Sequence, residues 1–139
     1  MNAYNKAYLD EITENQGKLF DLVAMNYPDK DTKEFIKSYM KSTTRKNIDN
    51  AQAYLCTMDA KELWHYYNKH ESAELPSGTS LKGFLPDWIG EFYAYYQWYY
   101  NIPSAVIVDK IPIEYLETHY AGLHDLDLSL AVQKVGAIS

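Results

Sequence analysis

Two carboxylates beside the most aromatic stretch of the sequence have a spacing that suits acid–base chemistry. Asp87 and Glu91 are four residues apart, so on a helix they lie on the same face. Burial of one carboxyl group would raise its pKa and make the two residues an acid and base pair. Pro86 predicts that a helix begins just before them, and the positive end of a helix also favours carboxylates. Both interpretations stay open, and we favour the second.

Residue types that bind metals gather in a second place. His119, His124 and Asp125 could serve as ligands for zinc or another divalent cation. On a helix, residues five apart point about 140° apart, so the two imidazoles converge only if Gly122 interrupts the helix. We expect instead that Asp125 caps the last helix and that His124 packs beside it.

Motifs of the common enzyme classes are missing from the sequence. It contains no nucleophile elbow, no phosphate-cradling glycine loop, no dinucleotide fingerprint and no His-Glu-x-x-His pattern. We therefore expect a protein without catalytic activity, without a metal and without a cofactor.

Four cations follow one another at helical spacing. Lys33, Lys37, Lys41 and Arg45 are each four residues apart, which would place them on one face of a continuous helix. Such a face could bind an acidic partner or a phosphate, or it could simply be solvated. If the helix were continuous, Ile48 would point out among these cations, so we predict a break or bend near residues 42–44.

The charge distribution argues against nucleic acid as a direct ligand. Residues 1–70 hold equal numbers of basic and acidic side chains, so the whole net charge of -6 lies in residues 71–139. Arg45 is the only arginine, which leaves little for bidentate contacts with bases or phosphates. We expect no binding to DNA or RNA.

Residues 92–100 contain seven aromatic side chains in nine positions, too many to form a single stripe on a helix. We therefore expect a central helix covered on most sides, whose tyrosine hydroxyls reach polar partners. Alternatively, one side of this helix faces a partner chain or a flat ligand, because Tyr and Trp dominate binding hot spots. The candidates for that surface are Trp88, Glu91, Tyr95 and Tyr99.

Apolar periodicity and capping signals predict an all-α protein, a compact bundle of six or seven helices in a single domain over residues 1–139. Helices are expected over 4–26, from 32 to the break near 42, over 46–57, up to about 70, from 86 to a stop at 101–103, and over 125–135. Residues 104–110 and 112–120 are expected to form short helical pieces, and 71–85 a long connection. Residues 126–132 also alternate as a strand would, so helix and strand both remain open there.

Cys56 is the only cysteine, which excludes an internal disulfide and indicates a reducing compartment. Its apolar neighbours predict a buried thiol that packs as a small hydrophobe. The sequence shows neither a signal peptide nor an apolar run of membrane-spanning length. We therefore expect a cytoplasmic protein that does not enter a membrane.

The second half of the chain, from Gly83-Phe84-Leu85-Pro86-Asp87-Trp88 through Leu123-His124-Asp125-Leu126-Asp127, resembles a family of small uncharacterised bacterial proteins. Members of that family resemble accessory proteins of toxin–antitoxin-like cassettes. The resemblance covers about half of the chain, includes no motif of assigned role and implies a partner-binding protein.

We expect this protein to bind another protein in a regulatory, antitoxin-like role, or to self-associate. The contact would form through the aromatic helix or through the basic stripe, the four cations Lys33, Lys37, Lys41 and Arg45. The alternative is a small-ligand binding protein or enzyme with an aromatic-walled pocket. Its rings would be Trp88, Tyr95 and Tyr99, and its polar groups Asp87, Glu91, His119 and His124. A deep pocket at these residues would favour the alternative, whereas a flat apolar patch at a two-fold contact would favour the first.

Overall fold

The computed structural model describes residues 4–71 and 74–138, and within these ranges the chain is helical and contains no strand. The all-α prediction is therefore confirmed. The elements in chain order are η1 (Lys6–Tyr8), α1 (Leu9–Asn26), α2 (Thr32–Met40), α3 (Thr43–Asp49), α4 (Ala53–Cys56), α5 (Ala60–His70), α6 (Leu85–Tyr100), α7 (Ser104–Lys110), α8 (Ile113–Leu123) and α9 (Leu128–Val135).

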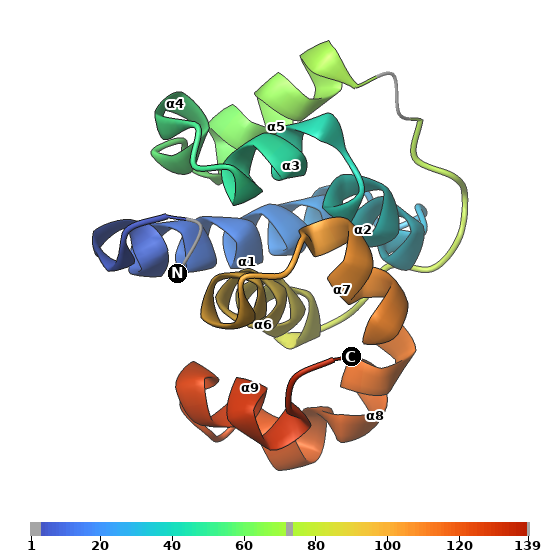
Figure 1. Ribbon diagram of the computed structural model, residues 1–139. Coiled ribbons are helices and arrows are strands. Elements are labelled where there is room, and N and C mark those ends of the chain that lie inside the picture. The colour runs from blue at the N-terminus through green and yellow to red at the C-terminus, as the bar shows by residue number, and fades with distance from the viewer. Residues whose placement is uncertain (1–3, 72–73, 139) are drawn as a thin grey trace.

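The helices are arranged in layers around the pair α1 and α6, as Figure 1 shows. Helix α1 lies between α5 and α6, and α6 lies between α1 and α9. Helices α2 and α7 pack on each other at the side of this stack. The buried apolar side chains form one continuous cluster that runs through these layers. Among the described helices, none is both long enough and apolar enough to cross a membrane.

Two glycines set the distance between α1 and α6. A Cβ atom built on Gly90 would lie 2.7 Å from the carbonyl oxygen of Gln16 and 2.7 Å from the Cα atom of Gly17. The Gln16 side chain adds a hydrogen bond across the same crossing, with Nε2 donating to the Gly90 carbonyl oxygen at 2.8 Å. Because side chains are missing at the crossing point, the two backbones pack directly on each other.

The aromatic helix α6 occupies the centre of the fold, as predicted. Phe92, Tyr93 and Tyr96 are fully buried. The Tyr93 hydroxyl donates to the Ile111 carbonyl oxygen at 2.6 Å, and the Tyr96 hydroxyl donates to the Gly136 carbonyl oxygen at 2.7 Å. The hydroxyls thus reach backbone acceptors at the ends of α7 and α9, so the rings can be buried without stranding a polar group.

The capping signals predicted at α5 and α2 are present, in full at α5 and as a one-way cap at α2. Asp59 and Glu62 form a reciprocal capping box at the start of α5, and the Asp31 carboxylate accepts from the Glu34 amide at the start of α2. The break expected near residues 42–44 is also present, because Ser42 caps a new helix there. Cys56 is buried, in agreement with the prediction of an inert position.

Two segments differ from the prediction. The helix expected over 46–57 is wrong: α3 and α4 are separated by a turn in which Ala51 adopts a left-handed conformation with φ of 64°, which apolar periodicity cannot reveal. This extra break brings the described residues to nine α-helices. At the C-terminal end, the helical alternative is correct over 128–135, but Asp127 and not Asp125 stands at its N-cap. Of the long connection expected over 71–85, residues 72 and 73 lie outside the description and 74–84 are irregular.

We predict that Gly90→Ala lowers the free energy of unfolding by about 1–3 kcal/mol, because the new methyl group meets backbone atoms that cannot move aside. Gly122→Ala is the matched control: it lies in α8 with open space around it, and it should be neutral or stabilising by up to about 1 kcal/mol. Urea unfolding of both variants measures the difference. Equal stabilities would contradict a backbone-to-backbone crossing.

Candidate functional site

A surface groove of about 450 Å³ lies between α6 and the corner that joins α8 to α9. We call it the α6–α9 groove. Helix α6 contributes the first three lining residues and the α8–α9 corner the others: Trp88, Glu91, Tyr95, His124, Leu126, Asp127, Leu128 and Ser129. Four of the residues singled out in the sequence for a ligand site therefore lie together, although they are up to 36 positions apart in the chain.

The carboxyl group of Glu91 is the electrostatic centre of the groove. Burial and, to a smaller extent, the neighbouring carboxylates of Asp87 and Glu14 together raise the pKa of Glu91 to about 7. The pKa of Asp87 is also raised, by burial and then by Asp21, while Lys18 acts against the shift. Glu91 therefore changes charge near neutral pH, a property common at binding and catalytic sites.

Aromatic rings form one wall of the groove. Trp88 is only 7% exposed, packs edge-on against Tyr120 at 5.3 Å between ring centroids, and has an indole N–H without an acceptor among the described residues. Tyr95 is half-buried and stacks on Tyr99 at 6.2 Å. Tyr99 itself is 38% exposed and lies one turn beyond the groove lining. The predicted aromatic wall is thus Trp88 and Tyr95, with Tyr99 beside it.

The two imidazoles do not converge. Helix α8 continues through Gly122, so each histidine stacks on a tyrosine one turn earlier: His119 on Tyr115 at 4.0 Å and His124 on Tyr120 at 4.3 Å. Within the described residues no three potential ligands gather in a way that could hold a metal ion.

Only His124 reaches the groove. Its Nδ1 lies 2.7 Å from the Tyr120 carbonyl oxygen, and its Nε2 lies 3.2 Å from a carboxylate oxygen of Asp125. Asp125 thus contacts this imidazole and does not cap a helix, which corrects the role predicted for it. His119 is held by the Tyr115 carbonyl oxygen at 2.8 Å and does not line the groove.

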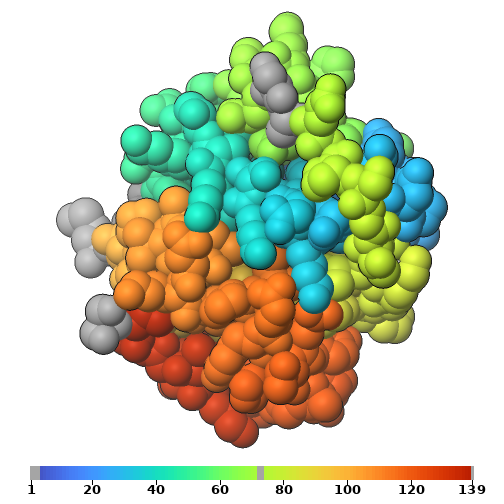
Figure 2. Space-filling view, turned by 90° about the vertical axis from the view of Figure 1, so that its right-hand side faces the viewer, coloured from blue at the N-terminus to red at the C-terminus, as the bar shows by residue number. Residues whose placement is uncertain are grey.

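The three lysines of the basic stripe are engaged with carboxylates of the protein itself. Lys33 lies 2.5 Å from Glu117 of α8, and Lys41 lies 2.8 Å from Asp109 of α7. Lys37 is 3.6 Å from Glu34 of its own helix. Figure 2 shows the face on which the light-blue and teal residues of α2 meet the orange residues of α7 and α8. Lys33 and Lys41 thus join the region of α2 to α8 and α7 across that seam, whereas Lys37 pairs within its own helix.

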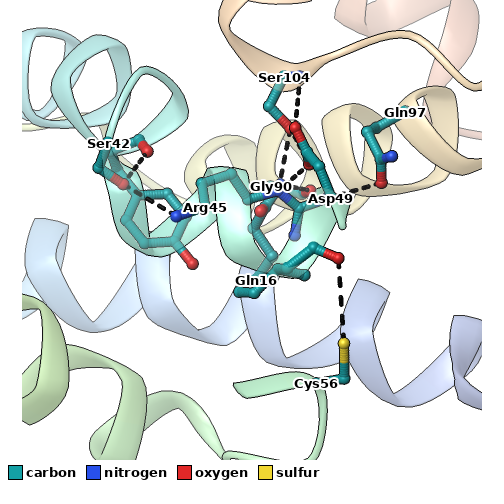
Figure 3. Close-up of polar contacts among 10 residues, drawn as sticks. Gln16, Ser42, Arg45, Asp49, Cys56, Gly90, Gln97 and Ser104 are labelled. Atoms are coloured by element: carbon teal, nitrogen blue, oxygen red, sulfur yellow. Dashed lines mark hydrogen bonds and ion pairs between the residues drawn. The ribbon is translucent and has the colours of Figure 1, made fainter. Parts of the chain in front are cut away.

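Arg45 does not belong to the stripe, and its prediction as a surface binding residue is wrong. The chain turns after α2, so Arg45 points into the core, where it is 0% exposed (Figure 3). Its Nε lies 3.2 Å from Asp49 and donates to the Ser104 hydroxyl at 3.0 Å, and its Nη2 donates to Gln97 at 3.2 Å. Ser104 in turn donates to both carboxylate oxygens of Asp49, at 2.7 and 2.8 Å.

This buried network is the feature that sequence reasoning missed. The Arg45 side chain links α3 to α6 and α7, and burial raises the pKa of Asp49, an effect that Arg45 and Ser104 oppose. The i, i+4 spacing of Arg45 and Asp49 is the one signal that could have indicated it. A fully buried ion pair whose remaining hydrogen bonds are satisfied contributes to the fold, and it offers no surface for a ligand.

A second hollow of about 530 Å³ follows the outer face of α5 and was not predicted. Its lining includes Lys61, His65 and Lys69, which are four residues apart along the helix. It therefore has the opposite charge character to the α6–α9 groove. Apart from Met58, its lining residues all belong to α5, and they do not converge with residues from distant segments.

Comparisons with protein-family models, with curated proteins and with solved structures give no match. The resemblance of the second half of the chain to a bacterial family therefore stays a prediction, and the candidate site depends on its geometry alone.

We predict that Arg45→Met lowers the free energy of unfolding by about 3 kcal/mol or more, because it leaves Asp49 charged and unpaired in the core. The matched control Lys37→Met removes an exposed cation and should cost less than about 0.5 kcal/mol. The double variant Arg45→Met with Asp49→Leu should recover part of the loss. Urea unfolding tests all three, and equal costs for the two single variants would contradict the assignment.

We predict that Glu91→Gln raises the free energy of unfolding by about 1 kcal/mol at pH 8, after allowance for solvent screening, and leaves it unchanged near pH 4. The pKa of Glu91 is raised from 4.5 to about 7 in the folded state. Between these values the folded protein binds a proton that the unfolded chain does not, so wild-type stability falls as the pH rises. Above about pH 7 this contribution to the stability of the wild type is completely lost.

Urea unfolding at pH 4, 6 and 8 measures this effect. Glu11→Gln is the control, because Glu11 is exposed on α1 and does not line the groove. If Glu91→Gln raised the free energy of unfolding by the same amount at every pH, the pKa of Glu91 would not be raised by its surroundings, and the prediction would be contradicted.

Proposed function

We propose that this protein is a non-catalytic recognition protein that binds a regulatory partner protein through the α6–α9 groove. The observation that carries the proposal is the convergence of Trp88, Glu91, Tyr95 and His124 from two distant parts of the chain into one groove. Aromatic rings beside charged side chains are common anchors of protein recognition. The groove is open at the surface and is not a deep pocket, which favours a protein partner over an enclosed small ligand.

The surroundings of the groove support a protein partner. Tyr99 stacks beside Tyr95 and stays 38% exposed, and Leu130 on the neighbouring α9 is 51% exposed. Exposed rings and aliphatic side chains on the two helices that border the groove can continue a contact beyond the groove itself. Such a surface is consistent with the regulatory role expected from the resemblance of the second half of the chain to accessory proteins of toxin–antitoxin-like cassettes.

The groove chemistry supports recognition more than catalysis. Both ring nitrogens of His124 are engaged, one with the Tyr120 carbonyl oxygen and one with Asp125. Neither nitrogen of the imidazole is therefore directed at the Ser129 hydroxyl, which also lines the groove. Glu91 can change its proton occupancy near neutral pH, and this makes binding sensitive to pH without requiring a reaction.

Binding of a small ligand is the second candidate, and one observation favours it. The groove volume of about 450 Å³ lies within the range of small-molecule sites, about 300–1,000 Å³. In that case Trp88 and Tyr95 would stack on the ligand, and Glu91 with Asp127 would orient it.

Affinity capture with the purified tagged protein, from an extract of the cells that encode it, tests the proposal. We expect a partner that is retained by wild type and lost at least about tenfold in Tyr95→Ala, because truncation of an anchoring ring commonly removes more than 1 kcal/mol of binding. Tyr115→Ala is the matched control, since Tyr115 is 38% exposed on α8, outside the groove.

Capture that is equal in Tyr95→Ala and wild type would contradict the groove as the binding site. Mass spectrometry of the gently purified protein separates the two candidates. A bound small molecule that Tyr95→Ala releases, without any protein partner, would support the second.

A further inference from the structure

We propose, as a refinement that rests on the function above, that the α6–α9 groove receives a lysine or arginine side chain from a basic segment of the partner protein. The cationic end would lie between the carboxylates of Glu91 and Asp127, and the aliphatic stem would lie along Trp88 and Tyr95. The inference concerns the chemistry of the bound group, and it follows from charge, rings and burial together.

The charges around the groove are predominantly negative. Glu91 and Asp127 line it, Asp87 and Glu14 lie close enough to Glu91 to raise its pKa, and Asp10 acts on Tyr95 in the same way. The carboxylates come from α1, α6 and the start of α9, so they belong to three separate elements. An anionic ligand would be repelled from this place, and a cation would be attracted to it.

The basic side chains near the groove are already engaged. Lys18, the cation that acts on Asp87, lies 2.6 Å from Glu14, and His124 contacts Asp125. Neither is placed to neutralise Glu91, and this is consistent with a carboxyl group that ionises only near neutral pH. A cation supplied by a partner would therefore meet a carboxylate that forms no ion pair with the residues that the structure describes.

The aromatic wall suits the rest of a basic side chain. Trp88 and Tyr95 line the groove on the same helix as Glu91, seven residues apart and on either side of it. Ring faces attract cations within about 6 Å, and the methylene groups of lysine and arginine pack well on such rings. Leu126 and Leu128 supply an apolar surface on the opposite side. The groove thus offers both parts of the environment that a long cationic side chain needs.

A basic occupant makes binding depend on pH in a defined direction. Protonated Glu91 cannot pair with a cation, so affinity rises as the pH increases through about 7. The charged groups that face Glu91 are Asp87 on α6, Glu14 with Lys18 on α1, and His124 with Asp127 at the α8–α9 corner. Because other ionisable side chains also line the groove, a Glu91 variant is needed to assign the pH dependence to Glu91.

The test is titration of the intact protein with blocked pentapeptides. Binding is measured from the NMR signals of the Trp88 indole and of the backbone amides that line the groove. The probe is acetyl-Gly-Gly-Lys-Gly-Gly-amide, and its partner replaces lysine with the uncharged isostere norleucine. At pH 8 we expect the lysine peptide to bind about tenfold more tightly than the norleucine peptide. We also expect the affinity of the lysine peptide to be at least about threefold lower at pH 6 than at pH 8. Glu91→Gln should remove most of this preference and the pH dependence, whereas Glu11→Gln should keep both.

Equal binding of the lysine and norleucine peptides would overturn the cationic occupant. Binding of n-butylammonium as tightly as the lysine peptide would overturn a protein segment as its source, in favour of a small amine. If a partner is captured by wild type and lost in Tyr95→Ala while the lysine peptide does not bind, the inference fails and the proposed function stands. If the lysine peptide binds as expected and no protein is captured, the proposed function fails.

Discussion

The close crossing of α1 and α6 is the constraint on which the other packing depends. Because Gly17 and Gly90 have no side chains, the two backbones meet directly, and Gln16 ties them together with a buried hydrogen bond. Helix α6 is thereby held at the centre, and its large rings can project in all other directions. Helices α7–α9 then pack around α6, while α2–α5 lie on the side of α1 that faces away from α6.

The core also contains a charged network that links these groups. Arg45 and Asp49 on α3 contact Ser104 at the start of α7 and Gln97 on α6 (Figure 3). A buried ion pair adds little net stability compared with apolar packing, but an incomplete one is strongly unfavourable. The network therefore penalises any arrangement in which α3, α6 and α7 do not meet, and in this way favours a single packing of the helices.

The α6–α9 groove arises from the same arrangement. Most rings of α6 are used to bury the helix, while the edge that includes Trp88, Glu91 and Tyr95 faces the α8–α9 corner, which does not fill the space completely. Glu91 is partly desolvated because it lies next to the α1 crossing, where Asp87 and Glu14 are also close. The position of a titrating carboxyl group beside two rings is thus a consequence of how α6 is anchored.

The sequence by itself determined the helical class, the capping at Asp59, the break near residue 42 and the central place of α6, because these depend on local periodicity and short-range hydrogen bonds. The residue types in the sequence also indicated four of the residues that line the groove, Trp88, Glu91, Tyr95 and His124. Only the tertiary structure decided that Arg45 is buried and that His124 lies across from Glu91 while His119 does not. Such pairings depend on where a turn redirects the chain, as at Ala51, and on contacts between segments far apart in sequence, which periodicity does not encode.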